Sequence, residues 1–232
     1  SWNIVRINSQ TKKTFFWSLI IASFFIGIFG WIQYVFYPDL TSLKYIGWDD
    51  HLYRLVGTFL DPGFTGILLV FGFLGTLTAY LNTSNKRLLF FLFFFTITIA
   101  LTYSRASYIA LLGGVVYLTV RQKNLKILGV FLVIFLLTVL FLPRPAGEGV
   151  KLTRVSSIYP RLENYRETLE IFRKSPLFGI GYNNLCAERQ SVSSSNNFAL
   201  DSHSCSGSDS SLLLILATTG IVGFLLFLTF LY

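Results

Sequence analysis

The sequence predicts an all-α membrane protein with about six transmembrane helices and one large polar loop. Hydrophobic residues make up 53% of the 232 residues and charged residues only 13%, whereas a soluble domain carries about 25% charged residues. The apolar residues also occur in blocks that approach the roughly 20 helical residues needed to cross a bilayer. Because the chain begins without Met and ends inside an apolar run, we expect it to be a fragment of a longer polytopic protein.

Six apolar segments are the candidate spans. They lie at about residues 14–37, 63–81, 88–103, 106–120, 127–142 and 212–232. The stretch from 88 to 120 is too long for one ordinary span and short for two, and Ser104-Arg105 interrupts it. A charged residue at the centre of a membrane costs about 2.5–3.5 kcal/mol. We therefore expect a helical hairpin that turns at Ser104-Arg105.

The distribution of charge predicts the orientation of these spans. With six spans, segments 1–13, 82–87 and 121–126 share one side of the membrane, and they contain eight Lys and Arg residues but no Asp or Glu. The net charge of +8 therefore lies on that side, which the positive-inside rule makes cytoplasmic. The excess of Lys and Arg over Asp and Glu is thus explained by the membrane topology and by contact with anionic lipids. It does not indicate a nucleic-acid partner, and none is expected.

The large extracytoplasmic loop, residues 143–211, contains recognisable elements. An apolar stripe at helical spacing predicts an amphipathic helix along the membrane surface, with the stripe formed by Leu162, Tyr165, Leu169 and Phe172. Ser175-Pro176 ends this helix. Gly179 and Gly181 then permit a tight turn.

Side chains able to titrate or cross-link lie on the outer side of this topology. They include His51, His203 and both cysteines, and Cys186 and Cys205 share the large loop, where they can form a disulfide on the oxidising side. The adjacent residues 49–51 (Asp-Asp-His) could suggest a metal site. Three consecutive residues rarely converge on one ion, so we expect none.

Each candidate also has a simpler interpretation. Arg161 and Arg166 on an amphipathic helix are usually solvated or contact lipid headgroups. In the simpler interpretation, Arg105 at the tip of a hairpin only caps a turn, and a lone His203 in a Ser-rich loop has no catalytic role. The Gly179/Gly181 pair lacks the preceding strand and the longer glycine pattern of a phosphate-binding fingerprint.

Four stretches, in this order, resemble the O-antigen ligase and polymerase family of bacterial envelope proteins. Residues 54–62 (RLVGTFLDP) are similar to the family's R-x-x-G-T-F-x-x-P segment, and residues 101–107 (LTYSRAS) to its L-T-x-S-R motif. Residues 161–182 are similar to its Arg-containing helix followed by P-L-x-G-x-G. Residues 203–223 are similar to its His-to-glycine block, although Ser204 and Thr219 stand where the family usually has Asn and an acidic residue.

The resemblance implies a glycan transferase. Such proteins take a saccharide from a polyprenyl diphosphate carrier at the outer face of the bacterial inner membrane and pass it to a glycan, to lipid A core or to protein. His203 is then the expected general base for the acceptor hydroxyl, with Arg105 and Arg161 as catalytic residues. Arg54, Arg105, Arg161 and Arg166 are the expected ligands of the donor diphosphate, without a metal or other cofactor.

Two readings from other classes compete with the transferase. One is an anion transporter, for example of bicarbonate, and the other is a non-catalytic membrane assembly partner. A transporter typically has broken helices and polar residues at mid-membrane. The predicted spans carry only small polar groups, and the ionisable residues gather at the outer face. This pattern favours the transferase.

Overall fold

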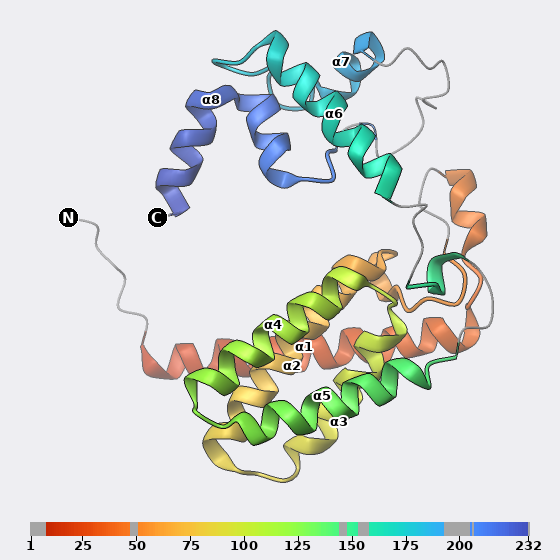
Figure 1. Cartoon of the computed structure of the whole chain (residues 1–232), viewed down its shortest axis with the longest axis vertical. Coiled ribbons are helices and arrows are strands. Elements are labelled where there is room, and N and C mark those ends of the chain that lie inside the picture. Colours follow the sequence, from red (N-terminus) through yellow and green to blue (C-terminus); the bar gives the residue numbers. More distant parts are fainter. Residues whose placement is uncertain are drawn as a thin grey trace. The chain divides into compact units, whose positions relative to one another are not determined.

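The part of the chain that the structure describes is helical throughout (Figure 1). This computed structural model describes residues 8–46, 51–143, 148–152, 158–192, 205 and 207–231, with one isolated bridge between Asp39 and Leu52. The α-helices are α1 (Ser9–Phe36), α2 (Pro62–Thr83), α3 (Leu88–Leu101), α4 (Arg105–Arg121), α5 (Leu125–Leu140), α6 (Ile158–Lys174), α7 (Leu185–Val192) and α8 (Ser211–Leu231). Short 3₁₀ helices cover Thr41–Ile46, Gly57–Phe59 and Glu148–Val150.

The chain forms two compact units. The first comprises Ser1–Leu40 with His51–Leu152 and contains α1 to α5. The second comprises Thr41–Asp50 with Thr153–Tyr232 and contains α6 to α8. Each unit has its own hydrophobic cluster.

Helix α2 lies at the centre of the first unit, where it contacts α1, α3 and α4. Phe73 on α2, Phe95 on α3 and Leu111 on α4 are almost fully buried in the shared core. The outer faces are also apolar, as Phe29 on α1 and Val133 on α5 show with exposed fractions of 52% and 59%. Such broad exposed apolar surface is typical of helices that face lipid.

Small residues let the helices of the first unit approach closely. A Cβ atom on Gly72 of α2 would lie 2.5 Å from the Ser23 Cβ of α1 and 2.8 Å from the Phe95 ring of α3. The Ser23 hydroxyl donates a hydrogen bond of 3.0 Å to the Leu68 carbonyl. Close packing and interhelical hydrogen bonds of this kind hold membrane helices together, since lipid removes most of the hydrophobic driving force between them.

The break expected at Ser104-Arg105 is present as a helix boundary. Helix α3 ends at Leu101, and α4 begins at Arg105 with Ser104 as its N-cap. Within the described residues, α1, α2 and α8 are long and apolar enough to cross a membrane, and α3 and α5 are shorter apolar helices. The protein is therefore an α-helical membrane protein, while the number of six spans stays a prediction.

In the second unit, α6 and α7 pack on α8 around Ile171, Leu185 and Ala217. The helix expected in the large loop is thus present as α6. Its buried face carries Thr168 and Ile171, with exposed fractions of 1% and 0%. The predicted apolar stripe is divided, because Phe172 packs against this cluster while Leu162 and Leu169 are exposed.

Helix α8 differs from the single continuous helix expected for residues 212–232. Gly220 has φ 68° and ψ −173°, which breaks the helix into two halves. This backbone conformation is essentially restricted to glycine. The sequence did not predict the break, because glycine is also common in unbroken membrane helices.

Candidate functional site

The side chain of Arg54 is buried against the turn between α3 and α4. Its Nε donates to the Thr102 carbonyl at 3.1 Å and its Nη2 to the Tyr103 carbonyl at 3.4 Å. The neighbouring Leu55 amide donates to the Leu101 carbonyl at 3.0 Å. Carbonyls at the carboxyl end of a helix and in the turn after it have no partner within that helix, and a guanidinium can bind several such carbonyls at once. Arg54 therefore holds the turn that precedes Arg105.

Helix α1 fixes the backbone around Arg54 through one glutamine. The Gln33 Oε1 accepts from the Val56 amide at 2.9 Å and the Gly57 amide at 3.4 Å, and its Nε2 donates to the Arg54 carbonyl at 3.3 Å. Thr65 on α2 donates its hydroxyl to the Val56 carbonyl at 2.5 Å. The R-x-x-G-T-F segment is thus held rigidly between two helices.

Arg105 is the first residue of α4, and its side chain is half-buried. The Ser104 hydroxyl caps the helix by accepting from the Ser107 amide at 3.3 Å, and the Ser107 hydroxyl donates to the Ser104 hydroxyl at 2.9 Å. The amino terminus of a helix carries a partial positive charge. A guanidinium beside a helix amino terminus has the charge and the hydrogen-bond donors that suit a phosphate group.

The two arginines expected on α6 lie on its surface. Arg161 is exposed, and Arg166 forms an ion pair with Glu170 one turn later at 3.1 Å. The Arg166 side chain is 81% exposed and that of Glu170 38%, and surface ion pairs of this kind contribute little to stability. Both cations are therefore accessible from solvent or from a membrane surface.

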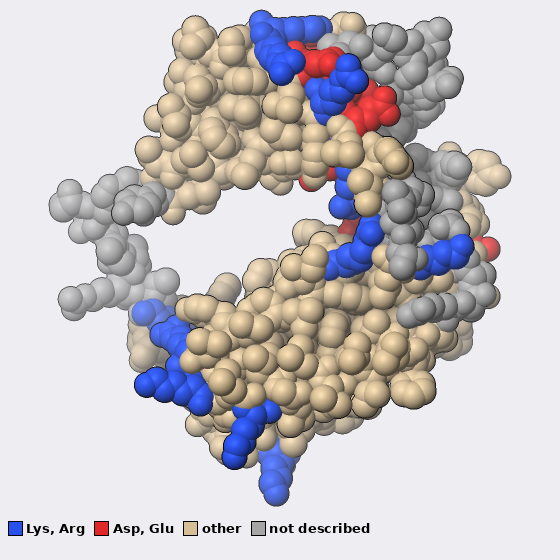
Figure 2. All heavy atoms as spheres, viewed as in Figure 1, with Lys and Arg blue, Asp and Glu red and all other residues tan. Residues whose placement is uncertain are grey.

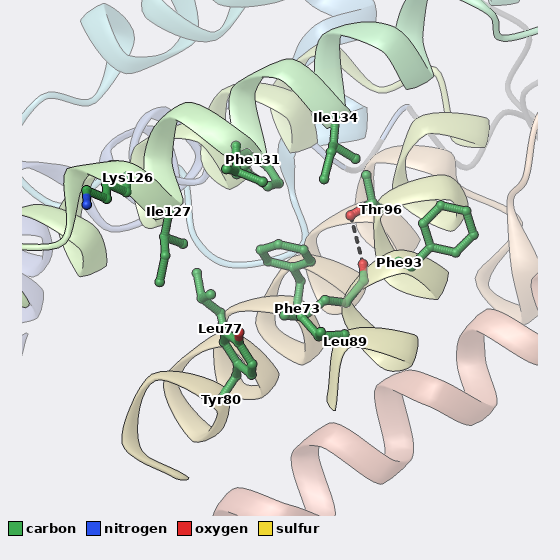
Figure 3. Close-up of a pocket in the computed structure, with 12 residues that line it drawn as sticks. Phe73, Leu77, Tyr80, Leu89, Phe93, Thr96, Lys126, Ile127, Phe131 and Ile134 are labelled. Atoms are coloured by element: carbon green, nitrogen blue, oxygen red, sulfur yellow. Dashed lines mark hydrogen bonds between the residues drawn. The ribbon is translucent and has the colours of Figure 1, made fainter. Parts of the chain in front are cut away.

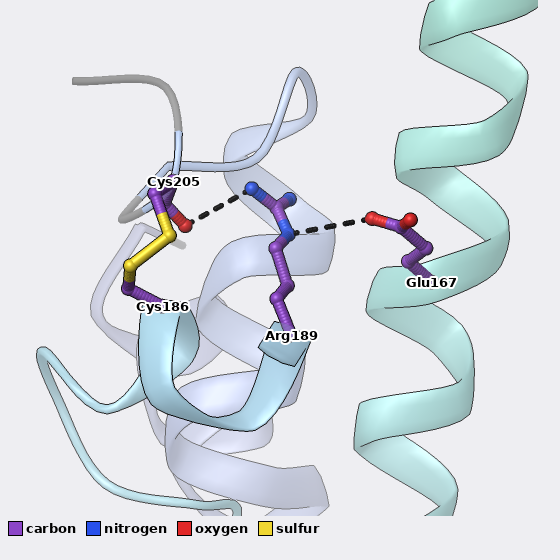
Figure 4. The surroundings of a disulfide bond; sticks show 4 residues. All are labelled: Glu167, Cys186, Arg189 and Cys205. Atoms are coloured by element: carbon purple, nitrogen blue, oxygen red, sulfur yellow. Dashed lines mark hydrogen bonds and ion pairs between the residues drawn. A yellow bond between two sulfur atoms is a disulfide. The ribbon is translucent and has the colours of Figure 1, made fainter. Parts of the chain in front are cut away.

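A third arginine of the second unit, Arg189, is buried and was missed by the sequence analysis (Figure 4). Its Nη1 donates to the Cys205 carbonyl at 3.0 Å, and its Nε lies 3.7 Å from the Glu167 carboxylate of α6. Cys205 forms a disulfide with Cys186 on α7, with 4.9 Å between the Cα atoms. The disulfide and Arg189 thus fix the same point of the chain.

Burial shifts the protonation equilibria of this pair in opposite directions. Desolvation raises the pKa of Glu167 above its ordinary value, an effect that Arg189 opposes and that Glu163 and Glu170 reinforce. Desolvation lowers the pKa of Arg189, and Glu167 and Asp209 counteract that change. Both shifts follow from placing charges in a poorly solvated site.

The segment Pro176–Gly181 closes the break in α8 with backbone hydrogen bonds. Two amides of the segment donate to α8, and two amides of α8 donate to the segment. The bonds are Ile180 to the Ala217 carbonyl (3.0 Å), Gly181 to Thr218 (2.9 Å), Ile221 to Pro176 (2.9 Å) and Val222 to Leu177 (3.3 Å). These bonds satisfy the polar groups freed by the break.

Two glycines make this contact possible. A Cβ atom on Gly179 would lie 2.4 Å from the Thr218 carbonyl carbon, and one on Gly220 would lie 2.2 Å from the Leu177 carbonyl oxygen. Gly179 and Gly181 have φ values of 68° and 88°, as expected for the tight turn. We name the segment 176–181 together with the Gly220 break the backbone clasp.

The predicted general base His203 lies outside the described part of the chain, and so do Asp49 and Asp50, for which no metal site is expected. His51 is described and buried, and its carbonyl accepts from the Leu40 amide at 2.8 Å. Of the predicted cations, the first unit brings Arg54 and the Arg105 turn together, and the second unit carries Arg161 and Arg166 on one helix.

A profile of the O-antigen ligase family matches residues 88–228, well over half of the chain. The chain belongs to the O-antigen ligase family. No curated protein and no solved structure matches it significantly. The match confirms the predicted family and, together with the apolar helices, a membrane protein of polysaccharide biosynthesis.

Within this member of the O-antigen ligase family, the matched region includes the Arg105 turn, α6, the disulfide and the backbone clasp. Arg54 precedes the match but binds carbonyls inside it. Arg54 is therefore better suited to hold Arg105 in place than to bind a substrate directly. No pattern around Arg189 identified it as buried, although it follows Cys186 by one helical turn.

Proposed function

We propose that this O-antigen ligase transfers a saccharide from a polyprenyl diphosphate carrier at the outer face of the bacterial inner membrane. The acceptor is a glycan, lipid A core or protein. The large loop, residues 143–211, lies on the extracytoplasmic side in this proposal. Its support is the family match together with the predicted one-sided distribution of basic residues.

The observation that carries the proposal is the position of Arg105. It stands at the start of α4, beside a turn whose Thr102 and Tyr103 carbonyls are bound by Arg54. Tying these carbonyls to Arg54 reduces the negative potential that they would present to an anion. Arg105 and the helix amino terminus can then stabilise the negative charge that develops on the departing diphosphate.

The remaining roles belong to the second unit. Arg161 and Arg166 are exposed on α6 and bind further oxygens of the diphosphate, with Arg166 exchanging its partner Glu170 for the donor. His203 removes the proton of the acceptor hydroxyl as its oxygen attacks the anomeric carbon. The bond from that carbon to the diphosphate breaks, and the carrier leaves as polyprenyl diphosphate. Arginines supply the charge neutralisation that a metal ion provides in other transferases.

Transfer from a polyprenyl diphosphate donor by the full-length protein in vesicles tests this function. We expect Arg105→Ala to lower the rate by about 100-fold or more, as loss of a preorganised donor does elsewhere. Arg105→Lys should recover part of the activity, because it keeps the charge but loses the planar fork. The matched control is Arg121→Ala, which removes a cation from the other end of α4. Full activity of Arg105→Ala, or equal losses in both alanine variants, would contradict the proposal.

The break in α8 is a feature that transporters also have. In transport proteins, the groups freed by such a break coordinate the substrate or ion. Here the Ala217 and Thr218 carbonyls and the Ile221 amide are bonded to the backbone clasp. These groups already have hydrogen-bond partners. The break is therefore compatible with the transferase and does not favour the transporter. Anion flux into vesicles that is unaffected by donor and acceptor would favour transport.

A further inference from the structure

An apolar pocket opens in the first unit between α5 on one side and α2 and α3 on the other (Figure 3). Its volume is about 480 Å³, within the range of about 300–1,000 Å³ typical of ligand sites. Phe73 of α2 and Phe131 of α5 are both buried, with ring centroids 5.3 Å apart. The pocket follows α5 from Lys126 to Ile134, a length of about 12 Å.

The interior of the pocket suits hydrocarbon. The Thr96 hydroxyl in its wall already donates to the Leu92 carbonyl at 2.7 Å, as Figure 3 shows. Phe93 on α3 and Val130 on α5 line the pocket and are also 59% and 61% exposed on the apolar surface of the unit. An acyl chain can therefore enter laterally from the surrounding bilayer.

The mouth of the pocket is strongly basic. Lys126, the second residue of α5, lines it. The two connections at this end, residues 84–87 and 122–124, add further cations, and Arg121 ends α4. The sequence contains no Asp or Glu between Asp61 and Glu148, and Figure 2 shows Lys and Arg without acidic neighbours at this end of the unit. This charge selects an anionic headgroup.

We propose that this pocket binds one acyl chain of an anionic phospholipid, with the lipid phosphate beside Lys126. The site is separate from the Arg105 turn, which lies at the opposite end of α4, and its occupancy does not depend on glycan transfer. Basic pockets between membrane helices are a recurrent way to bind anionic lipid headgroups. The bound lipid fills the space between α5 and its neighbours.

Photo-crosslinking tests the site directly. The full-length protein is reconstituted into phosphatidylcholine vesicles that contain a small, equal fraction of phosphatidylglycerol or phosphatidylcholine with a photoactivatable group on the acyl chain. Adducts are mapped by mass spectrometry and expressed as the ratio of pocket-wall adducts to adducts on the outer face of α5 around Val133. This ratio cancels the general attraction of anionic lipid to a basic surface.

We expect a pocket ratio about fivefold higher for phosphatidylglycerol, the effect of about 1 kcal/mol for one cation near the lipid phosphate. Lys126→Ala should remove that preference, while Lys12→Ala, which removes an exposed cation of α1 outside the pocket lining, should keep it. Val130→Trp should reduce pocket adducts, while Val133→Trp, at a site equally exposed on the same helix, should not.

Four results would overturn the proposal. One is equal labelling by the two lipids, and another is an unchanged ratio in Val130→Trp. The third is displacement of the label by polyprenyl phosphate but not by unlabelled phosphatidylglycerol, which would make the pocket a site for the carrier. Absence of pocket adducts would be the fourth, because it would show that no acyl chain enters the pocket.

Discussion

The two units each contain an interrupted apolar helix, but they close the interruption differently. Between α3 and α4, a side chain supplies the missing hydrogen bonds, because the Arg54 guanidinium binds the Thr102 and Tyr103 carbonyls. In α8, backbone supplies them, because the segment 176–181 binds both sides of the break at Gly220. A buried guanidinium and a pair of close-packed glycines thus solve the same problem of unpaired polar groups in an apolar environment.

The difference has a functional consequence. At the first break the carbonyls are bound from one side, and the cation Arg105 stands at the start of the next helix. At the second break, carbonyls and amides of α8 are hydrogen-bonded to amides and carbonyls of the segment 176–181. The first arrangement places a charged group at the amino terminus of a helix, whereas the second bonds the segment 176–181 to α8. We therefore propose diphosphate binding at the first break and a structural role for the second.

The largest expected effect concerns the glycines of the backbone clasp. Gly220→Ala and Gly179→Ala each place a Cβ atom against carbonyl backbone and force alanine into positive φ. The strained backbone alone costs about 1–3 kcal/mol, and the contact adds to it. We expect the second unit to lose its fold, seen as rapid proteolysis between α6 and α8 in detergent.

Gly207→Ala serves as the control for the clasp variants, because a Cβ atom there meets nothing within 4 Å. It should resist proteolysis as the unchanged protein does. If Gly220→Ala were equally resistant, the backbone clasp would not be needed to hold the second unit together, and the contrast between the two breaks would fail.

The next effect concerns Arg189. Arg189→Met leaves the Glu167 carboxylate without this cation and the Cys205 carbonyl without its donor. Removing one partner of a buried ion pair costs about 3–5 kcal/mol, so the melting temperature should fall markedly. The double variant with Glu167→Gln should be more stable than Arg189→Met alone. A double variant that is less stable than either single one would show that the two side chains act independently.

The smallest effect is a dependence of stability on pH. The pKa of Glu167 is raised from 4.5 in the folded protein, mainly by desolvation. A raised acid pKa gives a stabilising contribution that is present below the unfolded value and is lost as pH rises through the folded value. Melting temperatures from about pH 4 upward should therefore fall more in the unchanged protein than in Glu167→Gln. If the melting temperatures of the two proteins changed with pH in parallel, Glu167 would not be the cause of the pH dependence.

Local chemistry explains which parts of the fold could be predicted. The charge of Arg105 inside an apolar stretch predicted the boundary between α3 and α4, and the stripe ending at Ser175-Pro176 predicted α6. The positive φ values of Gly179 and Gly181 agree with the predicted turn. Each of these features depends on residues close together in the sequence.

Long-range pairings could not be predicted in this way. Arg54 binds carbonyls 48 and 49 residues away. Its local motif does not reveal these partners, and therefore the sequence suggested a phosphate ligand instead. Gly220 breaks α8 only because the segment 176–181 supplies partners for the freed groups. Arg189 is on a short helix next to a polar segment, and its burial depends on Glu167 and Cys205.

The most direct test of the account is a double-mutant cycle on the rate of glycan transfer. Arg54→Ala, Arg105→Ala and the double variant are compared in vesicles, with melting temperatures to verify the fold. If Arg54 acts by positioning Arg105, its removal should lower kcat/KM in the unchanged background but have little further effect once Arg105 is absent. Losses that multiply in the double variant, or full activity without Arg105, would contradict the account.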